Sequence, residues 1–434
     1  MKKIKVALVG AGNRGQAYCN YSLSNPEELE VVAVCDVNPI ILKTACDKYK
    51  ISSDRAFSDL DEFLSKNIEC DFVVNATMDE MHYETAMKII NAGYDMLIEK
   101  PITPDYNELK DIYQASVKKG VKVLVCHVLR YTPFYRTIKS LIANDEIGDI
   151  VSMEINEHVW CGHYLDSYVR GKWRSEKECG SPMLLAKCCH DTDVLCWLNN
   201  KTVPKTISSF GSRRLFVPEN APKDSTEFCY QCPHNDTCLY SAQKVHLEFD
   251  AMPFQTWRKI DKPWQEITKE EKAEFLKHDI YGKCAYKTDA DIIDRQCVSI
   301  EFENGSIATH NLIAGTQKED RWIHVVGTKG EIQGYISTSK ITVTKIDRSE
   351  GVYTPRETVY DVSSEVVSNA DYGGHAGGDF AIMYDLVRFF GENKSSLSLT
   401  KIEDSINGHL VVYGAEKSRK ERRFVDISEF DFKK

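Results

Sequence analysis

The sequence lacks any apolar run near the ~20 residues that a membrane-spanning helix requires, so we expect no membrane insertion. It also lacks a basic excess: 55 Lys and Arg stand against 65 Asp and Glu, a formal net charge of −10, which disfavours broad contact with nucleic acid. No cleavage region typical of a secretory signal follows Met1, and no internal repeat or low-complexity linker is evident. We therefore expect a cytoplasmic protein, and the 42% hydrophobic content predicts packed cores rather than disorder.

The 434 residues predict two or three domains, and the patterns favour two. Residues 1–128 alternate nearly all-apolar strand segments with helical segments, which is typical of βαβ units and a doubly wound parallel sheet. Strands are expected at 4–9, 31–35, 71–76, 96–99 and 121–127, and helices at 14–24, 39–49, 82–92 and 105–119.

Residues 129–434 predict a second α/β domain built on a largely antiparallel sheet. Strand signals dominate beyond residue 296, and Glu303-Asn304-Gly305 is a strong hairpin turn. Strands are expected at 150–158, 297–302, 306–314, 322–327, 331–336 and 340–346, and helices at 134–143, 182–198, 378–391 and 402–418. A long polar segment, about 200–295, shows no regular pattern and predicts an irregular, cysteine-containing insertion.

A glycine-rich turn follows the first expected strand and leads into a helix. It contains Gly10, Gly12 and Gly15, with Asn13 and Arg14 between the last two glycines. Glycines at this spacing allow a tight turn, a close approach of the backbone to a pyrophosphate, and packing of helix on strand. Because the turn lies between a strand and a helix, it indicates a dinucleotide site more specifically than the glycine spacing alone does. The alternative is an incidental glycine turn in a sheet domain.

Asp36 lies at the end of the second expected strand, at the distance that a dinucleotide site requires. A carboxylate there accepts hydrogen bonds from the adenosine ribose hydroxyls and repels a 2′-phosphate. No Lys or Arg occurs between Val37 and Leu42, which favours NAD over NADP, although Arg14 remains a candidate to meet a phosphate.

Polar residues also occur where other strands of the first domain end: Asn75, Thr77, Glu99, Lys100 and His127. Ligands of open α/β sheets bind at this edge, so all five are candidate cofactor-binding residues. The Lys100 ammonium is suited to hydrogen-bonding a substrate hydroxyl and stabilising an alkoxide as hydride leaves. The alternatives are a surface lysine paired with a carboxylate and, for His127, a structural histidine.

A polar stripe interrupts the apolar helix expected at 182–198. Lys187, His190 and Asp191 are three and four residues apart and share one helix face. Buried polar groups need partners, so this stripe indicates either a catalytic site or a structural ion-pair network.

Several segments together resemble the Gfo/Idh/MocA family of oxidoreductases (glucose–fructose oxidoreductase and inositol 2-dehydrogenase). They are GAGNRG, VCDVNP, VVNATMDEMHYETAMKIINAGYDMLIEKPI, HVLRYTPFYRTIKSLIANDEIG and MLLAKCCHDTDVLCWL, and the likeness is strongest through residue 150. The resemblance implies a Rossmann domain, a C-terminal α/β domain with an open sheet, and a homodimer or homotetramer. It further implies NAD(P)-dependent oxidation or reduction of sugars, cyclitols or related polyols.

The resemblance also implies site residues. It places Lys100 near the nicotinamide and substrate hydroxyl, and His190 as the proton-transferring group. The family's common aspartate, four residues before that histidine, is Ala186 here, so we expect Lys187 to tune or replace it. The segments SYVRGKWR and YGGHAGGD suggest a subgroup, and they place His375 and Asp379 ahead of a helix that Asp379 is suited to cap. Candidate substrate-binding residues are His163, Arg170, Trp173, Arg174 and Asp191, and for the arginines and the tryptophan a packing role is an equal alternative.

Two other functions fit the same residues. Relatives of the family suggest a glycosidase that oxidises a ring hydroxyl with bound NAD, eliminates the aglycone and reduces the product again. A non-catalytic regulator that binds NAD or a sugar is the third hypothesis, and Lys100 and His190 argue against it.

Because no secretory signal is evident, we interpret most of the 15 cysteines as reduced thiols rather than as a disulfide framework. Four of them, Cys229, Cys232, Cys238 and Cys284, form a pattern suited to tetrahedral zinc, with His234 as a substitute ligand. An iron–sulfur cluster and ordinary reduced loop cysteines are the alternatives. A structural metal would explain how a polar segment so poor in core residues folds.

Overall fold

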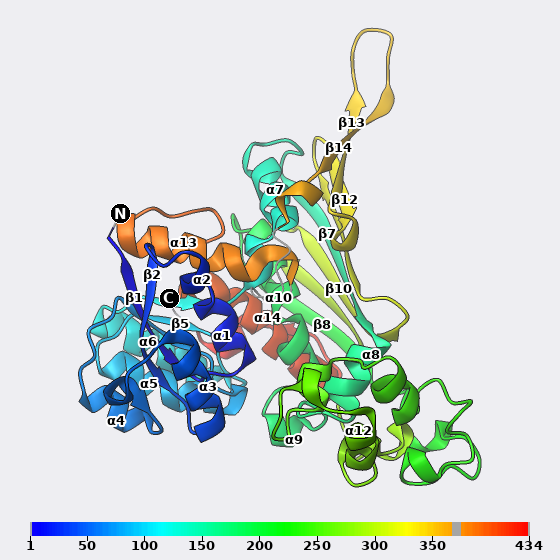
Figure 1. Ribbon diagram of the computed structural model, residues 1–434. Helices are drawn as coiled ribbons and strands as arrows, with labels where there is room; N and C mark the ends of the chain where they lie inside the picture. The colour runs from blue at the N-terminus through cyan, green and yellow to red at the C-terminus, as the bar shows by residue number, and fades with distance from the viewer. Residues whose placement is uncertain (1, 367–374, 433–434) are drawn as a thin grey trace.

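The computed structural model describes residues 2–366 and 375–432, which form two sheets with helices around them (Figure 1). The first sheet has six parallel strands in the order β3-β2-β1-β4-β5-β6. Its strands are β1 (Ile4–Val9), β2 (Leu29–Cys35), β3 (Ala56–Phe57), β4 (Phe72–Asn75), β5 (Met96–Ile98) and β6 (Val123–Val125). This is the doubly wound arrangement that the strand–helix alternation predicts, so the α/β fold class is confirmed.

Helices cover both faces of this sheet, and its strands are almost entirely buried because of it. The helices are α1 (Asn13–Cys19), α2 (Tyr21–Ser24), α3 (Pro39–Tyr49), α4 (Leu60–Ser65), α5 (His82–Asn91) and α6 (Tyr106–Lys119). Strand β3 and helix α4 were not predicted. Two residues of strand and a helix of under two turns are too short for a periodic pattern to emerge.

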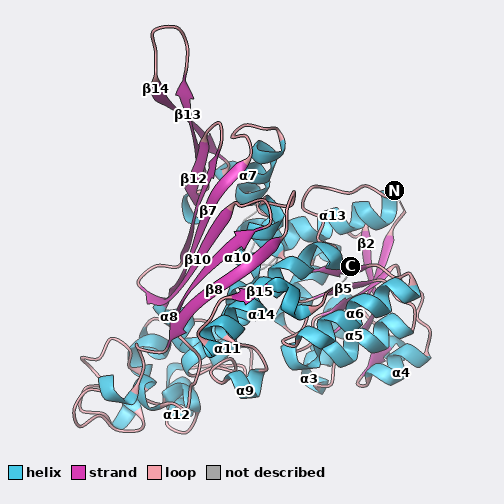
Figure 2. Cartoon of the chain, turned by 180° about the vertical axis from the view of Figure 1, so that it is seen from behind, coloured by secondary structure: helices cyan, strands magenta, loops and turns pink. Residues whose placement is uncertain are grey.

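The second sheet has nine strands in the order β14-β13-β12-β11-β7-β10-β9-β8-β15 (Figure 2). Only the β7–β10 pairing is parallel among the described strands, so the sheet is mostly antiparallel, as predicted. The strands are β7 (Ile150–Trp160), β8 (Pro204–Ser212), β9 (Arg295–Phe302), β10 (Ile307–Thr316), β11 (Asp320–Gly327), β12 (Glu331–Tyr335), β13 (Lys340–Asp347), β14 (Thr354–Asp361) and β15 (Val425–Asp426).

The second half of the chain contributes four longer helices: α7 (Pro133–Ala143), α10 (Met183–Leu198), α13 (Gly378–Glu392) and α14 (Ile402–Glu421). Helices α10 and α14 pack on each other between the sheets, and α13 lies over the first sheet (Figure 1). Ile382 and Leu386 of α13 join the core on one face of that sheet, and Ile406 of α14 joins the core on the other. The chain therefore returns to the N-terminal sheet after completing the second one.

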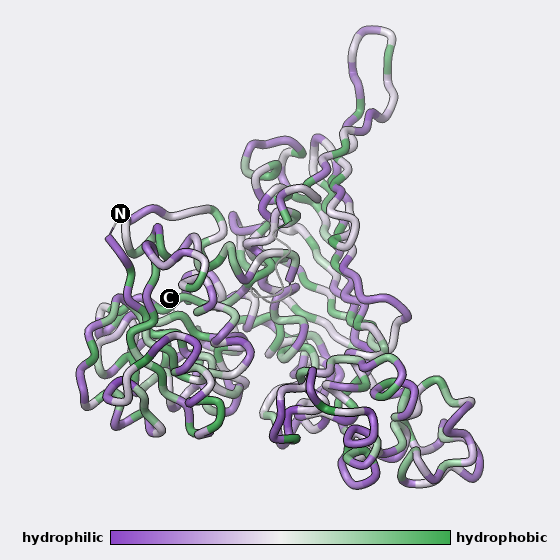
Figure 3. Tube along the Cα trace, in the orientation of Figure 1, coloured by the Kyte–Doolittle hydropathy of each residue, from purple (hydrophilic) through white to green (hydrophobic). Residues whose placement is uncertain are grey.

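The expected insertion begins later than predicted, because β8 occupies 204–212. Residues 213–294 form loops and short helices, among them α11 (Pro253–Thr256) and α12 (Lys269–Leu276), and α8 (Cys161–Tyr164) and α9 (Glu176–Cys179) lie beside them (Figure 1). Hydrophilic residues are frequent along this segment (Figure 3). Across the described residues, no helix combines the length and apolarity that a bilayer crossing needs.

Candidate active site

The glycine turn between β1 and α1 has the geometry of a dinucleotide-binding loop. Gly10 adopts a positive φ of 83°, and a side chain there would meet the Ala76 carbonyl oxygen at 2.5 Å. At Gly12, by contrast, a side chain would meet no described atom within 4 Å, so the backbone is open on that side. No described side chain accepts a hydrogen bond from the first backbone N–H groups of α1. These donors are therefore available to an anion such as a phosphate.

Asp36 helps to shape this loop. Its carboxylate accepts hydrogen bonds from the backbone N–H of Ala11 (2.7 Å) and of Asn38 (2.8 Å). The side chain is partly exposed at the carboxyl end of β2. A carboxylate fixed in this way keeps acceptor capacity for ribose hydroxyls.

Arg14 is committed to partners within the protein. Its Nε donates to Glu99 Oε1 at 2.7 Å, and its Nη atoms donate to both carboxylate oxygens of Asp379. Burial alone would raise the pKa of Glu99, but the charges of Arg14 and Lys100 and hydrogen bonds from Tyr18 and Arg14 lower it. Asp379 does not cap α13, whose N-cap is Gly377; it anchors Arg14 instead.

Two further strand-end residues support the loop that follows β4. Asn75 is fully buried, donates to Thr85 Oγ1 (2.9 Å) and accepts from Thr77 Oγ1 (3.0 Å). Thr77 is partly exposed, and its carbonyl contacts the ring of His82. Asn75 therefore has a structural role in holding this loop, whereas Thr77 is more accessible to a bound ligand.

Lys100 and His190 come together from different halves of the chain. The Lys100 ammonium donates to the carbonyl of Ala186 at 2.9 Å, one turn before His190 on α10. His190 is 4% exposed, and its Nδ1 has no hydrogen-bond partner among the described residues. Burial and then the nearby Lys100 charge hold the pKa of His190 well below its usual range, so the ring is neutral at physiological pH.

His190 lies among three other histidine rings, of which His127 and His409 are buried and His375 is exposed. His127 lies 5.7 Å from both His190 and His409, measured between ring centroids, and His375 lies 5.9 Å from His190. The pKa of His127 is lowered, first by burial and then by His409, Arg130 and Lys100. His409 Nε2 accepts from the Ile102 N–H, so its other nitrogen carries the proton. Burial lowers the pKa of His127, His190 and His409, so these three rings are neutral beside Lys100.

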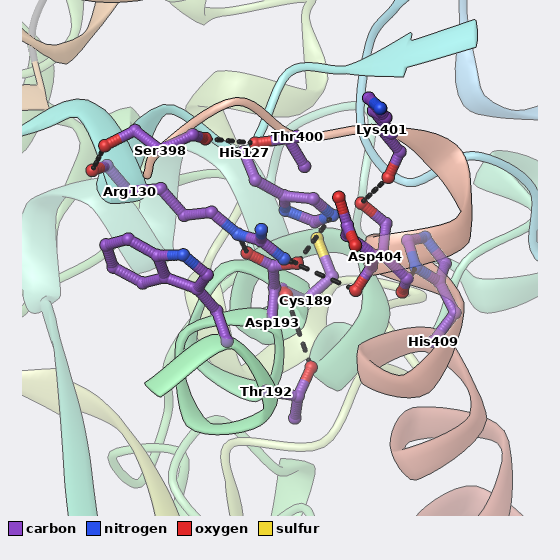
Figure 4. A network of polar contacts seen from close by, with 12 residues as sticks. His127, Arg130, Cys189, Thr192, Asp193, Ser398, Thr400, Lys401, Asp404 and His409 are labelled. Atoms are coloured by element: carbon purple, nitrogen blue, oxygen red, sulfur yellow. Dashed lines mark hydrogen bonds and ion pairs between the residues drawn. The ribbon is translucent and has the colours of Figure 1, made fainter. Parts of the chain in front are cut away.

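A buried ion pair that the sequence did not predict holds α10 beside His127 and His409 (Figure 4). Arg130 donates from Nε and Nη2 to the two carboxylate oxygens of Asp193, both at 2.6 Å, and both side chains are almost completely buried. A weaker bond from Arg130 reaches the carbonyl of Asp404 at the start of α14. Arg130 therefore joins the connection after β6 to both central helices.

Lys187 takes part in a second buried network, on the side of α10 that faces the nine-stranded sheet. Its ammonium lies 3.2 Å from Glu157 and 2.9 Å from Glu319. Although burial opposes it, these two carboxylates raise the pKa of Lys187, so it stays charged. Arg321 completes the network by donating to Asp191 (2.8 Å) and approaching Glu157 (2.6 Å). The structure thus surrounds Lys187 and Asp191 with structural ion pairs.

The predicted substrate-binding residues do not all meet. His163 bonds Glu319 at 3.1 Å beside Lys187, whereas Arg174 pairs with Asp289 and Glu178, both at 2.9 Å. Trp173 lies under the ammonium of Lys172, 3.9 Å from its ring centroid. Arg170 is fully buried and donates to two carbonyl oxygens of the insertion. The structure therefore directs Arg170 away from the Lys100–His190 pair.

A cavity of about 290 Å³ lies next to the strand-end residues. It extends from Met78, just after β4, to the insertion. The other lining residues are Glu80, Arg170, Gly171, Lys172, Arg174, Glu178, Cys179, Arg258, Lys259, Ile280 and Tyr281. Lys172 Nζ contacts the Met78 sulfur at 3.2 Å, and burial lowers its pKa to about 8.

The four predicted metal ligands share a second, much smaller cavity. Cys229, Cys232, Cys238 and Cys284 all line it together with His234. All fifteen cysteines are free of disulfide bonds. A different group, Cys188, Asp191 and His310, is the one set of described residues with three possible ligand atoms mutually within 4.8 Å.

Comparisons with known proteins agree with this geometry. Residues 4–127 match the profile of an oxidoreductase family with an NAD-binding Rossmann fold, and residues 139–427 match that family's C-terminal alpha/beta domain. The chain is 23% identical to the putative oxidoreductase YteT of Bacillus subtilis over 74% of its length and 73% of the relative's. It is 26% identical to inositol 2-dehydrogenase/D-chiro-inositol 3-dehydrogenase of Lactiplantibacillus plantarum, over 50% of this chain and 56% of that protein.

Solved structures share the fold across nearly the whole chain. An NAD-binding oxidoreductase from Klebsiella pneumoniae has a TM-score of 0.70 at 17% identity, with 98% of this chain and 99% of that one covered. Levoglucosan dehydrogenase in complex with NADH and levoglucosan has a TM-score of 0.67 at 17% identity, covering 98% and 100%. At such identities these likenesses show the fold alone. The two family profiles span most of the sequence, and the chain belongs to the Gfo/Idh/MocA family of NAD-binding oxidoreductases.

Proposed function

We propose that the protein transfers a hydride between nicotinamide and a hydroxyl-bearing carbon of a sugar, cyclitol or related polyol. One observation carries this proposal: the Lys100 ammonium and the neutral His190 ring converge at the carboxyl edge of the six-stranded sheet, beside the dinucleotide loop. The relatives named as inositol dehydrogenases and the neighbour bound to levoglucosan support a polyhydroxylated substrate.

The two residues have complementary roles in this proposal. Nicotinamide supplies the hydride chemistry when it is bound. The Lys100 ammonium donates a hydrogen bond to the substrate oxygen and stabilises the negative charge that develops there. His190 Nδ1, buried and without a described partner, is ready to accept the hydroxyl proton because burial keeps the ring neutral.

The residues around the pair hold it in place. Arg130 and Asp193 fix α10, and the Lys187 network fixes its other side. We assign a positioning role to Lys187, which follows Ala186 at the position of the family's common aspartate, since a lysine whose pKa is raised between two carboxylates is a poor base.

The cofactor is NAD rather than NADP in this proposal. Asp36 presents a carboxylate to the ribose, and Arg14, the nearby cation that could meet a 2′-phosphate, is already paired with Glu99 and Asp379.

The large cavity is proposed to hold the rest of the substrate. Its lining holds more cationic side chains (Arg170, Lys172, Arg174, Arg258 and Lys259) than carboxylates (Glu80 and Glu178). In a chain of net charge −10, this local cation excess favours a sugar that carries an acidic group.

A homo-oligomer in the cytoplasm is also proposed. The face of the nine-stranded sheet opposite α10 exposes Phe210, Ile307, Ile313 and Tyr335, each at least 40% exposed. A second copy would cover these side chains. Sedimentation measurements would show a dimer or tetramer, and a monomer at micromolar concentration would contradict this part.

The function is tested with Lys100→Met and His190→Asn, against Lys66→Ala, which changes an exposed lysine far from the site. Each site variant should lower turnover about 100-fold or more while NADH still binds, because each removes one partner of the reacting hydroxyl. The assay follows NADH with a panel of neutral and acidic sugars and polyols, and nitrophenol release from glycosides in parallel. Near wild-type rates would remove the changed residue from the reaction, and nitrophenol release without net NADH would indicate a glycosidase instead.

A further inference from the structure

The insertion brings four cysteines from two separate segments around one small cavity. Cys229, Cys232 and Cys238 come from a single stretch, and Cys284 comes from a loop 46 residues further along the chain. The cavity has a volume of about 10 Å³, roughly the space of one water molecule or one ion. The fold therefore brings Cys284 next to three cysteines that are distant from it in the sequence.

Tight backbone turns hold these thiols toward each other. The Cys232 N–H donates to the Cys229 carbonyl (3.0 Å), and the Cys238 N–H donates to the His234 carbonyl (2.8 Å). The Cys284 N–H donates to the Glu227 carbonyl (2.8 Å). A β-bridge between Phe228 and Lys283 pins the two loops side by side, one residue before each of Cys229 and Cys284.

Arg170 ties this cluster to the rest of the enzyme. Its Nε donates to the carbonyl of Lys283 (2.9 Å), and its Nη2 donates to the carbonyl of Tyr240 (2.8 Å) and lies 3.9 Å from the Cys229 sulfur. A fully buried guanidinium beside a thiol is the kind of outer partner that favours thiolate ligands of a metal. Its Nη1 has no hydrogen-bond partner in the described part of the chain.

The insertion has only a small core of its own. Its own buried core consists of Cys229, Ala242, Trp257, Ile267, Leu276 and Tyr281. Other buried residues of this segment pack instead into the core of the nine-stranded sheet: Phe216, Val245, Ala251, Ala285, Ile292 and Ile293. The outer part of the insertion therefore has a small core, and segments of this kind commonly depend on a structural metal.

The rival group, Cys188, Asp191 and His310, is less suited to a cation. Asp191 already accepts from Arg321 at 2.8 Å, and Arg321 also approaches Glu157, so a fixed positive charge occupies the place of the ion. The cysteine cluster holds no such charge inside it, although no three of its described sulfurs lie mutually within 4.8 Å. Ligation at the usual Zn–S distance of about 2.3 Å would draw the sulfurs inward.

We propose that Cys229, Cys232, Cys238 and Cys284 bind one structural Zn²⁺ ion as thiolates, releasing up to four protons to solvent, and that this site stabilises the insertion. Four thiolates leave the complex with a net charge of −2, which the neighbouring Arg170 partly offsets. Through Arg170 the site also holds the segment that continues to Lys172 and Arg174 at the large cavity.

The first experiment measures metal in the purified full-length chain, prepared without chelator and without added metal. Zinc at close to one ion per chain, released when the thiols are titrated with a mercurial reagent, is expected. Absence of bound metal, or iron together with acid-labile sulfide, would overturn the zinc assignment.

Single variants Cys232→Ser and Cys238→Ser are compared with Cys297→Ser, which changes an exposed cysteine outside the cluster. The cluster variants should lose most of the zinc and expose the insertion to limited proteolysis, whereas Cys297→Ser should keep both wild-type properties. Full zinc content in either cluster variant would contradict the proposed ligands. NADH binding, which depends on the glycine turn of the first sheet, reports that the six-stranded sheet remains folded.

Discussion

Replacing Asp193 by Asn should destabilise the protein strongly, because it leaves the charge of Arg130 buried without a counter-ion. The pair is bidentate, with two N···O distances of 2.6 Å, and neither side chain is more than 2% exposed (Figure 4). Breaking a buried pair by removing one partner costs about 3–5 kcal/mol. Because Asp193 is one helical turn beyond His190 on α10, we also expect turnover to fall.

Urea unfolding at constant pH measures the loss, with the pair Lys43–Asp47 as the control. That pair is largely exposed on α3, so Asp47→Ala should not shift the midpoint measurably. The double variant Arg130→Met/Asp193→Leu should recover most of the lost stability, since no unpaired charge remains. A loss under about 1 kcal/mol for Asp193→Asn would refute the reasoning. So would a double variant whose loss equals the sum of the losses measured for Arg130→Met alone and Asp193→Leu alone.

Two further predictions concern the cofactor and the pH dependence of stability. Asp36→Ser should reduce the preference for NADH over NADPH in a fluorescence titration, because it removes the repulsion of a 2′-phosphate; an unchanged ratio would exclude that role. Burial lowers the pKa of His310 to about 4, below the ordinary value of about 6.5, so the unfolded chain binds a proton between these values that the folded chain does not. Stability should therefore fall by about 2 kcal/mol on this account between pH 7 and 5, and His310→Asn should flatten the dependence of the unfolding free energy on pH over that window. An equally steep fall in the variant would mean that His310 does not contribute.

The fold could be predicted from the sequence where the pattern is long and local. The apolar strand at 4–9 and the helix at 402–418 recur almost unchanged in β1 and α14. The predictions fail where a strand needs distant partners: β8 lies in a stretch read as irregular, and β15 has two residues. Such strands form because a neighbouring strand, distant in the sequence, supplies their hydrogen-bond partners. The local sequence pattern of one segment does not identify that partner.

The site shows the same limit at the level of side chains. The stripe of Lys187, His190 and Asp191 was visible because it interrupts an apolar helix, but its partners Arg321 and Glu319 lie more than 120 residues away. The sequence indicates that buried charges need counter-ions without indicating which ones. Part of motif YGGHAGGD, residues 372–374, lies outside the described residues, so its contribution to the site stays a prediction.

Asp379 gives the clearest case of a residue whose role depends on tertiary contacts, and its removal can be tested directly. Its carboxylate accepts from Arg14 in the dinucleotide loop and lies 3.1 Å from Nδ1 of His375, whose ring neighbours His190. Burial would raise the pKa of Asp379, but His375 and Arg14 lower it, so its stabilising contribution is present at neutral pH and is lost as the pH falls below about 4.

Asp379→Asn keeps the shape of the side chain but cannot neutralise Arg14, which should then move relative to Glu99 and disturb the glycine turn. We expect KM for NAD to rise about tenfold with a smaller change in kcat, since a loop that binds the cofactor is disturbed more than the reacting pair. Asp385→Asn is the matched control, because Asp385 lies on the same helix and bonds Ser396 instead. An unchanged KM for NAD in a variant that unfolds at the wild-type urea concentration would show that the Arg14–Asp379 contact does not organise the cofactor loop. The two halves of the chain would then meet at this point for stability alone.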